Sequence, residues 1–445
     1  MNAEPAVPAE PEADAAPKRM TVLQAAFIGV GAMVGAGIFA LLGAAGAVAG
    51  SAVWVSFLIA GLIALLQGYS FAKLGSTFPS AGGMLAYLAK GFGEGHITGI
   101  VAWLFYMTGS IVVAMVATSF GGYASSVVAG NDPGWAVVLG IALVLVISAL
   151  NIVGSNAVAR VQAVIVNVVL AILTLFAIVT IANWDPSLLD PAGYPGLQHI
   201  ISSVALTFFA FLGFGVITFT AKDLPRPKRQ LPRAMYLALG IATTVYVAVS
   251  LGVFGTLTAD QVVAYGATAL AEAAKPTLGQ AGYVLMVITA LFSTTGAVNA
   301  SLYPAAGMTR YLAGVGQFPP VFGRTIGPRA PVGLVVAALL TIAMMLLLDL
   351  NAIASLGSAV ALLVFSAVTI SHFRTYKQTG AKLIILIIAL IATLGTFVVF
   401  AATTLVDQPR TAVALVIIVL GATVLDLVWK RIRRRNEAKD AAPGR

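Results

Sequence analysis

Long apolar stretches alternate with short breaks along nearly the whole chain. Each stretch holds close to the roughly 20 apolar residues that a helix needs to cross a bilayer, and the breaks are polar or rich in glycine and proline. The pattern predicts an all-α polytopic membrane protein with twelve transmembrane helices. The predicted spans cover residues 22–48, 52–74, 97–128, 135–153, 158–182, 200–220, 233–257, 280–309, 331–349, 352–372, 381–403 and 411–429.

The composition also indicates a membrane protein. Of the 445 residues, 60% are hydrophobic and only 9% are charged, and the mean hydropathy is +0.99. A soluble domain carries about 25% charged residues. The chain has no cysteine, which excludes disulfides, thiolate metal sites and a cysteine nucleophile.

The positions of the basic residues predict the orientation. Lysine and arginine are enriched in cytoplasmic loops. If the N-terminus is cytoplasmic, all of them except Lys275 and Arg410 fall in cytoplasmic segments. We therefore expect a multi-pass protein of the cell membrane with both termini in the cytoplasm.

The formal net charge of +9 does not indicate a nucleic-acid partner, because the basic residues are spread over short loops and one tail. Residues 430–435 directly follow the last span, where they would lie against anionic headgroups. The bilayer is thus the expected partner of this basic tail, residues 431–445. Residues 1–19 are rich in Ala, Pro and Glu and are predicted to be a disordered cytoplasmic leader.

The first span contains an unusual concentration of glycine. Gly29, Gly31, Gly35 and Gly37 all lie within it, although glycine is disfavoured in helix interiors by about 1 kcal/mol relative to alanine. One interpretation is that residues 34–39 are unwound and line a protein cavity, because free backbone groups are not tolerated in lipid. The alternative is a straight helix whose glycines allow close packing.

The sixth span repeats this feature, since Gly213 and Gly215 lie at its middle. The two interrupted spans are five apart, so the second set of five spans would be inverted relative to the first. Inverted repeats with discontinuous helices at matching positions indicate the binding site of a transporter. We predict repeats over residues 20–182 and 183–378, followed by two further helices over residues 379–430, and we favour unwinding of both interrupted spans.

Two other spans carry candidate chemistry. Aromatic residues Trp103 and Tyr106 near one end of the third span are predicted to form an interfacial belt; the alternative is the wall of a pocket. In the eighth span, Ser293, Thr294 and Thr295 either bond back to their own helix or supply oxygen ligands to a sodium ion, together with carbonyls freed in the first span.

With these residues in view, the chain resembles the amino acid/polyamine/organocation transporter family, whose members share the inverted-repeat leucine-transporter fold. The resemblance covers residues 20–430. It rests on residues 35–39 (GAGIF), 78–83 (FPSAGG) and 209–214 (FAFLGF), on the prolines and arginines of the loop after the sixth span, and on Arg310.

The resemblance implies a substrate site at the two interrupted spans. Amides of Gly35, Ala36 and Gly37 would hold a carboxylate, while carbonyls of Met33, Phe209 and Ala210 would hold an ammonium group. Phe209 would also act as an aromatic gate. The full predicted set is Ala32, Met33, Gly35, Ala36, Gly37, Phe209, Ala210, Gly213, Phe214 and Gly215.

Three departures from the family pattern argue against a proton-carrying lysine, a dibasic amino acid as substrate, and an acid partner for the basic loop, in that order. Val169 stands where several proton-coupled relatives have a lysine. Gly215 stands where exchangers of arginine and glutamate have an acid. Lys222 replaces the first acid of a usual acid pair.

We therefore expect an amino acid permease that works by alternating access on a neutral or modestly polar amino acid, without a cofactor and with Na⁺ as a candidate coupling ion. The alternatives are an exchanger without ion coupling and a carrier of organic cations or polyamines, which the scarcity of acids within the spans disfavours. An enzyme is not expected, because the three histidines lie on separate segments and no catalytic motif is present.

Overall fold

The computed structural model describes residues 20–80, 82–153, 157–327 and 329–440. The predicted leader and residues 441–445 of the predicted tail lie outside the described residues. The fold is almost entirely helical. The α-helices are α1 (Val22–Ala49), α2 (Val53–Thr77), α3 (Gly83–Phe92), α4 (His96–Val128), α5 (Pro133–Val153), α6 (Ala157–Ala182), α7 (Leu197–Phe209), α8 (Pro227–Phe254), α9 (Ala259–Tyr265), α10 (Ala269–Glu272), α11 (Lys275–Gly314), α12 (Val332–Leu347), α13 (Leu350–Thr379), α14 (Leu383–Phe400) and α15 (Pro409–Asp440).

Shorter elements connect these helices. They are the 3₁₀ segments η1 (Gly50–Ala52), η2 (Pro186–Leu189), η3 (Pro191–Gly193), η4 (Leu212–Asp223), η5 (Gly266–Thr268) and η6 (Pro320–Gly323), the π-helical turn η7 (Ala401–Leu405), and a small antiparallel hairpin of β1 (Thr325–Ile326) and β2 (Ala330–Pro331).

Ten segments of the described chain are helical, long and apolar enough to cross a membrane. The first of them, Val22–Thr77, contains both α1 and α2, and α12 is a shorter apolar helix. All twelve predicted spans overlap these helices, which confirms the expectation of an all-α membrane protein. The helix α8 begins at Pro227, earlier than the predicted span, which starts at residue 233. Proline is tolerated in the first turn of a helix, because the amide hydrogen that it lacks would have no partner there.

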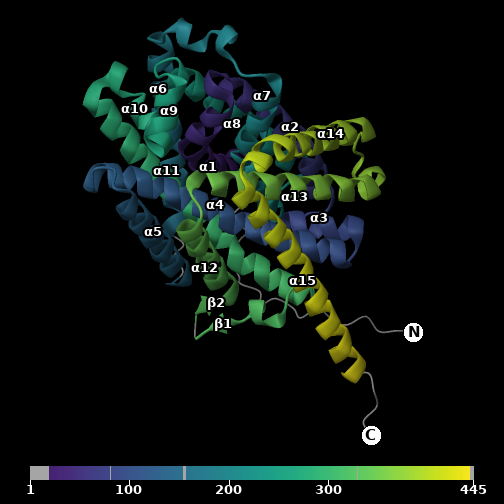
Figure 1. Cartoon of the computed structure of the whole chain (residues 1–445). Helices are drawn as coiled ribbons and strands as arrows, with labels where there is room; N and C mark the ends of the chain where they lie inside the picture. The colour runs from purple at the N-terminus through teal and green to yellow at the C-terminus, as the bar shows by residue number, and fades with distance from the viewer. Residues whose placement is uncertain (1–19, 81, 154–156, 328, 441–445) are drawn as a thin grey trace.

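The helix α1 lies at the centre of the bundle (Figure 1). It packs against α7, α8, α11 and η4, and residues 29–46 are all buried. A helix that is apolar on every side is expected in such a core position. Its start is fixed by a capping box in which the backbone amides and side chains of Thr21 and Gln24 bond each other.

The prediction that α1 is unwound at residues 34–39 is wrong for this structure, because α1 is helical from Val22 to Ala49. Its glycines serve close packing instead. A Cβ atom on Gly35 would overlap the backbone carbonyl of Ser293 in α11, and one on Gly37 would overlap Tyr246 of α8. The alternative interpretation, a straight helix with a glycine-lined packing face, is the one that the structure supports.

The sixth predicted span is broken, as expected. It consists of α7 and η4, separated by a turn at Ala210 and Phe211. The amides of both turn residues bond carbonyls three residues earlier, at 3.1 and 3.0 Å, and the hydroxyl of Tyr246 donates to the Ala210 carbonyl at 3.1 Å. The turn therefore leaves the α-helical path while neighbouring groups satisfy its backbone.

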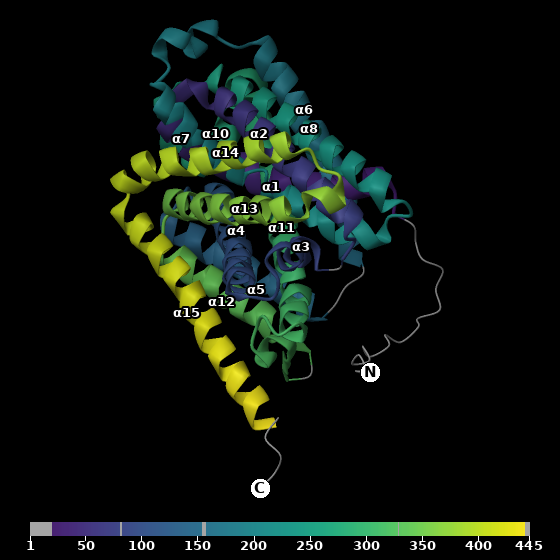
Figure 2. The ribbon, with the colours of Figure 1, turned by 90° about the vertical axis from the view of Figure 1, so that its right-hand side faces the viewer.

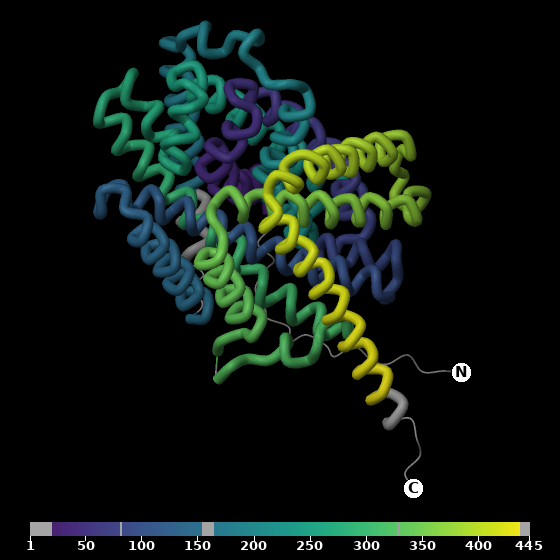
Figure 3. Tube along the Cα trace, viewed as in Figure 1, coloured from purple at the N-terminus to yellow at the C-terminus, as the bar shows by residue number. Residues whose placement is uncertain are grey.

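The last two long helices lie on the outside of the bundle. Figure 2 shows α14 beside α13, while α15 runs along the edge of the molecule, where it contacts α4 and α13. The tube in Figure 3 shows the same peripheral course of both helices. Their most apolar windows are only 28% and 22% buried, so most of their surface is left to face lipid.

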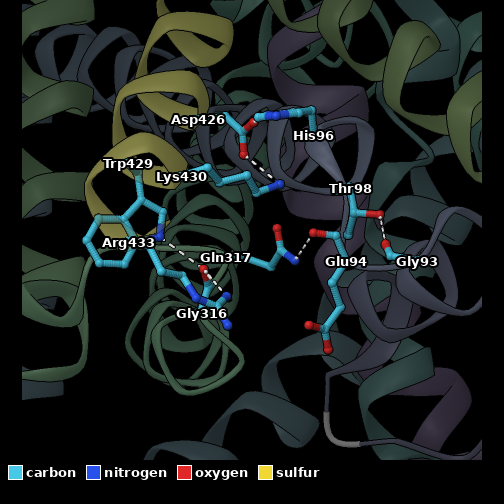
Figure 4. A network of polar contacts seen from close by, with 10 residues as sticks. All are labelled: Gly93, Glu94, His96, Thr98, Gly316, Gln317, Asp426, Trp429, Lys430 and Arg433. Carbon is cyan, nitrogen blue, oxygen red and sulfur yellow. Dashed lines mark hydrogen bonds and ion pairs between the residues drawn. The ribbon is translucent and has the colours of Figure 1, made fainter. Parts of the chain in front are cut away.

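A polar network holds α15 to the bundle (Figure 4). The side chain of Asp426 is fully buried, with one carboxylate oxygen 2.6 Å from Nδ1 of His96 and the other 3.1 Å from Nζ of Lys430. Further along α15, Trp429 and Arg433 both donate to the carbonyl of Gly316. The network thus joins α15 to the start of α4 and to the segment after α11.

Candidate substrate-binding site

A cavity of about 100 Å³ lies between α1, α4, the α7–η4 break, α11, α12 and α13. One water molecule needs roughly 10–15 Å³ of such cavity volume, so this cavity has room for a small solute. Its lining consists of Ala32, Ala36, Phe105, Tyr106, Thr108, Gly109, Ser110, Val112, Phe209, Leu212, Gly213, Gly215, Val216, Phe219, Ala300, Ser301, Leu302, Pro304, Ala305, Met308, Ala337 and Phe365.

Five of the ten predicted site residues line this cavity. They are Ala32 and Ala36 of α1, Phe209 at the end of α7, and Gly213 and Gly215 of η4. A Cβ atom on Gly213 would overlap the α1 backbone at Ala32, whereas one on Gly215 would meet no heavy atom within 4 Å. The first glycine therefore brings η4 against α1, and the second leaves space open.

The other five predicted residues lie in the packing around the cavity and do not line it. Gly35 and Gly37 face α11 and α8, as described above. Met33 is fully buried in the hydrophobic core. Ala210 packs against Gly37, and the ring of Phe214 packs against that of Phe71 of α2 at 5.3 Å between centroids.

The predicted gate residue, Phe209, stands in the cavity wall. Its side chain is 1% exposed, and it packs so closely on Gly357 of α13 that a Cβ atom there would overlap the ring. The ring therefore closes one side of the cavity in this conformation. Its role as a gate stays a prediction.

The helices α4, α11 and α12 contribute cavity walls that contain none of the predicted site residues. The prediction of an interfacial belt is wrong for Tyr106, and the alternative of a pocket wall holds: the residue is buried and lines the cavity, with its hydroxyl donating to the carbonyl of Gly333 at 2.6 Å. Trp103 is also buried and stacks on Phe318 at 3.7 Å. Small residues beside Tyr106, such as Gly109, were the available signal for a pocket wall.

The described residues that line the cavity include none with a charged side chain. The helix ends at the α7–η4 break supply partial charges beside the cavity. The C-terminal end of α7 carries partial negative charge and the N-terminal end of η4 carries partial positive charge. The site is therefore suited to a solute that bears both charges on adjacent groups.

The three candidate sodium ligands have different surroundings. Thr294 and Thr295 donate to carbonyls of their own helix, at 2.6 and 2.7 Å, which is the local bonding usual for threonine in a span. Ser293 instead lines a cavity of about 10 Å³ together with residues of α1 and α6, among them Val34 and Val169. The α1 carbonyls that were expected to complete a sodium site lie in a continuous helix.

Comparisons with known proteins agree with this architecture. A family model described as amino acid permease matches residues 20–427. An uncharacterized protein of Methanocaldococcus jannaschii is 31% identical over 421 residues, covering 94% of this chain and 97% of that protein. The inner membrane transport protein YbaT of Escherichia coli is 30% identical over 412 residues, covering 92% and 95%. The branched-chain amino acid permease BcaP of Bacillus subtilis is 28% identical over 245 residues, covering 50% and 51%.

These matches confirm the family resemblance seen in the sequence. The family model spans almost all of the described helices, and the relatives of nearly full length align from end to end. The chain belongs to the amino acid permease family and is a multi-pass membrane transporter rather than an enzyme.

Proposed function

We propose that the protein is a secondary transporter that moves a neutral or modestly polar amino acid across the cell membrane by alternating access. The uncharged cavity at the α7–η4 break carries this proposal. Helix ends alone can neutralise the ammonium and carboxylate of a zwitterion, so such a substrate needs no charged side chain in its site.

We assign twelve crossings to the chain, namely the ten long segments with α1 and α2 counted separately, together with α12. The first inverted repeat would run from α1 to α6 and the second from α7–η4 to α13, with α14 and α15 outside both. The break at Ala210 and Phe211 supports the second half of this assignment.

The amides of Gly35, Ala36 and Gly37 were expected to bind the carboxylate of the substrate. They now lie inside a continuous helix, so this binding requires α1 to open in another state of the transport cycle. Their role stays a prediction. In the state described here, the N-terminal end of η4, with its partial positive charge, is better placed for an anion.

Loop contacts support the predicted alternation of sides, whereas the choice of a cytoplasmic side for both termini rests on the positions of the basic residues. The indole of Trp54 bonds the hydroxyl of Tyr194 at 2.9 Å, and the amide of Asp185 bonds the carbonyl of Gly255. The predicted topology places all four on the outer side. The segments joined in Figure 4 all fall on its cytoplasmic side.

For coupling, we favour sodium symport through Ser293, Thr294 and Thr295, or exchange without an ion, over proton symport. Val169 lines the small cavity beside Ser293 and offers no proton-carrying group. Uptake measured with separate sodium and pH gradients, and with internal substrate, distinguishes the three. Uptake that follows only the pH gradient would contradict this ordering.

The transport proposal is tested by uptake of radiolabelled amino acids into proteoliposomes, with polyamines and organic cations in the same panel. Gly109→Leu serves as the inactive control, because a Cβ atom at Gly109 meets no heavy atom within 4 Å and a larger side chain would fill the cavity. We expect uptake of one or more neutral amino acids by the wild type only. Absence of uptake, exchange and binding for every amino acid would refute the proposal, and selective uptake of polyamines would favour the alternative substrate class.

A further inference from the structure

The wall of the cavity formed by α4 contains a hydroxyl group without a partner. Ser110 lines the cavity and is 1% exposed. Its Oγ atom is buried and has no hydrogen-bond partner among the described residues. By contrast, Thr108, which lines the same wall, donates to the carbonyl of Leu104 at 2.9 Å.

An unpaired buried hydroxyl is uncommon, because serine in a span can bond the carbonyl four residues earlier and most buried polar atoms have a partner. The backbone of Ser110 is itself well anchored, since its carbonyl accepts a bond from the hydroxyl of Thr341 in α12 at 3.2 Å. The unpaired hydroxyl is therefore a feature of the cavity wall rather than of a loosely held segment.

Two other serines show that the position of Ser110 matters. Ser148 and Ser366 also have buried hydroxyls without a partner among the described residues, but neither lines the cavity. Of these three serines, Ser110 is the one that belongs to the cavity wall. Beside it, Gly109 also lines the cavity and leaves open space.

We propose that Ser110 determines specificity by hydrogen bonding a polar group on the side chain of the transported amino acid. This inference rests on the proposed function. The charged groups of the substrate are assigned to the α7–η4 break, whereas Ser110 belongs to α4, a separate element of the wall. The substrate class is then a small neutral amino acid with a hydroxyl group, such as serine or threonine.

The expected preference follows from the unpaired hydroxyl. An apolar side chain of similar size would leave the Ser110 hydroxyl unpaired, and sites built to bond a substrate hydroxyl discriminate against analogues that lack it. We expect the wild type to favour serine over alanine, and threonine over valine, by about tenfold in kcat/KM, which corresponds to about 1.4 kcal/mol.

The test measures these two ratios in proteoliposomes for the wild type, Ser110→Ala and the matched control Ser366→Ala. We expect both ratios to fall about tenfold in Ser110→Ala and to stay at the wild-type value in Ser366→Ala. A change that only weakens the fold would lower uptake of all four substrates together and leave the ratios unchanged.

Unchanged ratios in an active Ser110→Ala variant would overturn the inference while leaving the proposed function intact. A wild type that transports no amino acid would overturn both. If Ser110→Ala proves inactive, the same two ratios are measured in Ser110→Cys. Cysteine is similar in size to serine but forms weaker hydrogen bonds, so both ratios should fall in that variant. Wild-type ratios in that variant would also overturn the inference.

Discussion

At the scale of single residues, glycine has two opposite roles around the cavity. Gly35 and Gly37 are places where neighbouring helices touch the α1 backbone, whereas Gly109 and Gly215 are places where nothing fills the space beside the chain. The letters of the sequence are the same in both cases. Only the neighbours, which come from distant segments, distinguish a packing glycine from one that leaves a cavity open.

Gly35→Ala is expected to lower the free energy of unfolding by about 1–3 kcal/mol, the usual effect of overpacking a tight core. The added methyl group would meet the backbone of Ser293, which cannot rotate away as a side chain could. Denaturant unfolding of the detergent-solubilised protein measures the change.

The matched control for this variant is Gly240→Ala in α8. A Cβ atom there meets no heavy atom within 4 Å, and alanine favours a helix by about 1 kcal/mol relative to glycine. We expect unchanged or slightly higher stability. Equal losses in both variants would argue against close packing at Gly35.

At the scale of elements, the sequence predicted the break in α7–η4 and also predicted a break in α1 that the structure does not show. Both segments carry paired glycines in an apolar span, so their patterns are alike. The difference lies in a long-range partner: the hydroxyl of Tyr246 bonds the carbonyl of Ala210 at the real break. The same hydroxyl packs against Gly37, where α1 continues as a helix. No local pattern contains that information.

Tyr246→Phe is expected to weaken this break. The substitution removes the donor to the Ala210 carbonyl, and an unpaired buried carbonyl is disfavoured by about 1–3 kcal/mol. We expect a lower unfolding temperature and a raised KM for the transported amino acid, measured by thermal unfolding and by uptake.

Tyr123→Phe is the control for this effect, because the hydroxyl of Tyr123 is buried without a partner among the described residues. Its removal deletes no hydrogen bond that the structure shows. A loss of stability equal to that of Tyr246→Phe would mean that the bond to Ala210 does not support the break.

Asp426→Asn tests how α15 is held. Removing one member of a buried ion pair commonly lowers stability by about 3–5 kcal/mol, because the remaining charge is left without its partner. Here that charge belongs to Lys430, which is itself buried. We expect a loss in that range in the free energy of unfolding, and recovery of part of it in the double variant Asp426→Leu/Lys430→Met.

The comparison variant is Glu272→Gln, which removes the partner of the exposed Lys275. An exposed pair contributes about 0–1 kcal/mol, so little change is expected. Similar effects of the two single variants would show that burial of the Asp426 pair does not determine how strongly it holds α15.

At the scale of the whole molecule, the membrane fold was predictable because the bilayer imposes a length and an apolar composition on every span. The cavity was only half predictable. The α7–η4 wall was marked by glycines in the sequence, whereas helices such as α4 are apolar on most sides, so their sequence does not show which face lines a pocket. Tyr106 and Ser110 were therefore not among the predicted site residues, and the small lining residues of α11 and α12 carried no signal of their own.

The predicted orientation can be tested directly, because the chain has no cysteine of its own. Single variants Ser187→Cys and Thr325→Cys place a thiol at exposed positions on opposite sides of the proposed membrane. A membrane-impermeant maleimide applied to intact cells should label the first and not the second, and both should react after the cells are opened. The reverse pattern would place the termini outside.

The segment η4 has a geometric consequence beyond the break itself. Its twelve residues are wound as a 3₁₀ helix, which rises about 2.0 Å per residue, whereas an α-helix rises about 1.5 Å. Rewinding η4 as an α-helix would shorten it by about 6 Å. The distance between the α7–η4 break and the start of α8 is thus set by the winding of one segment.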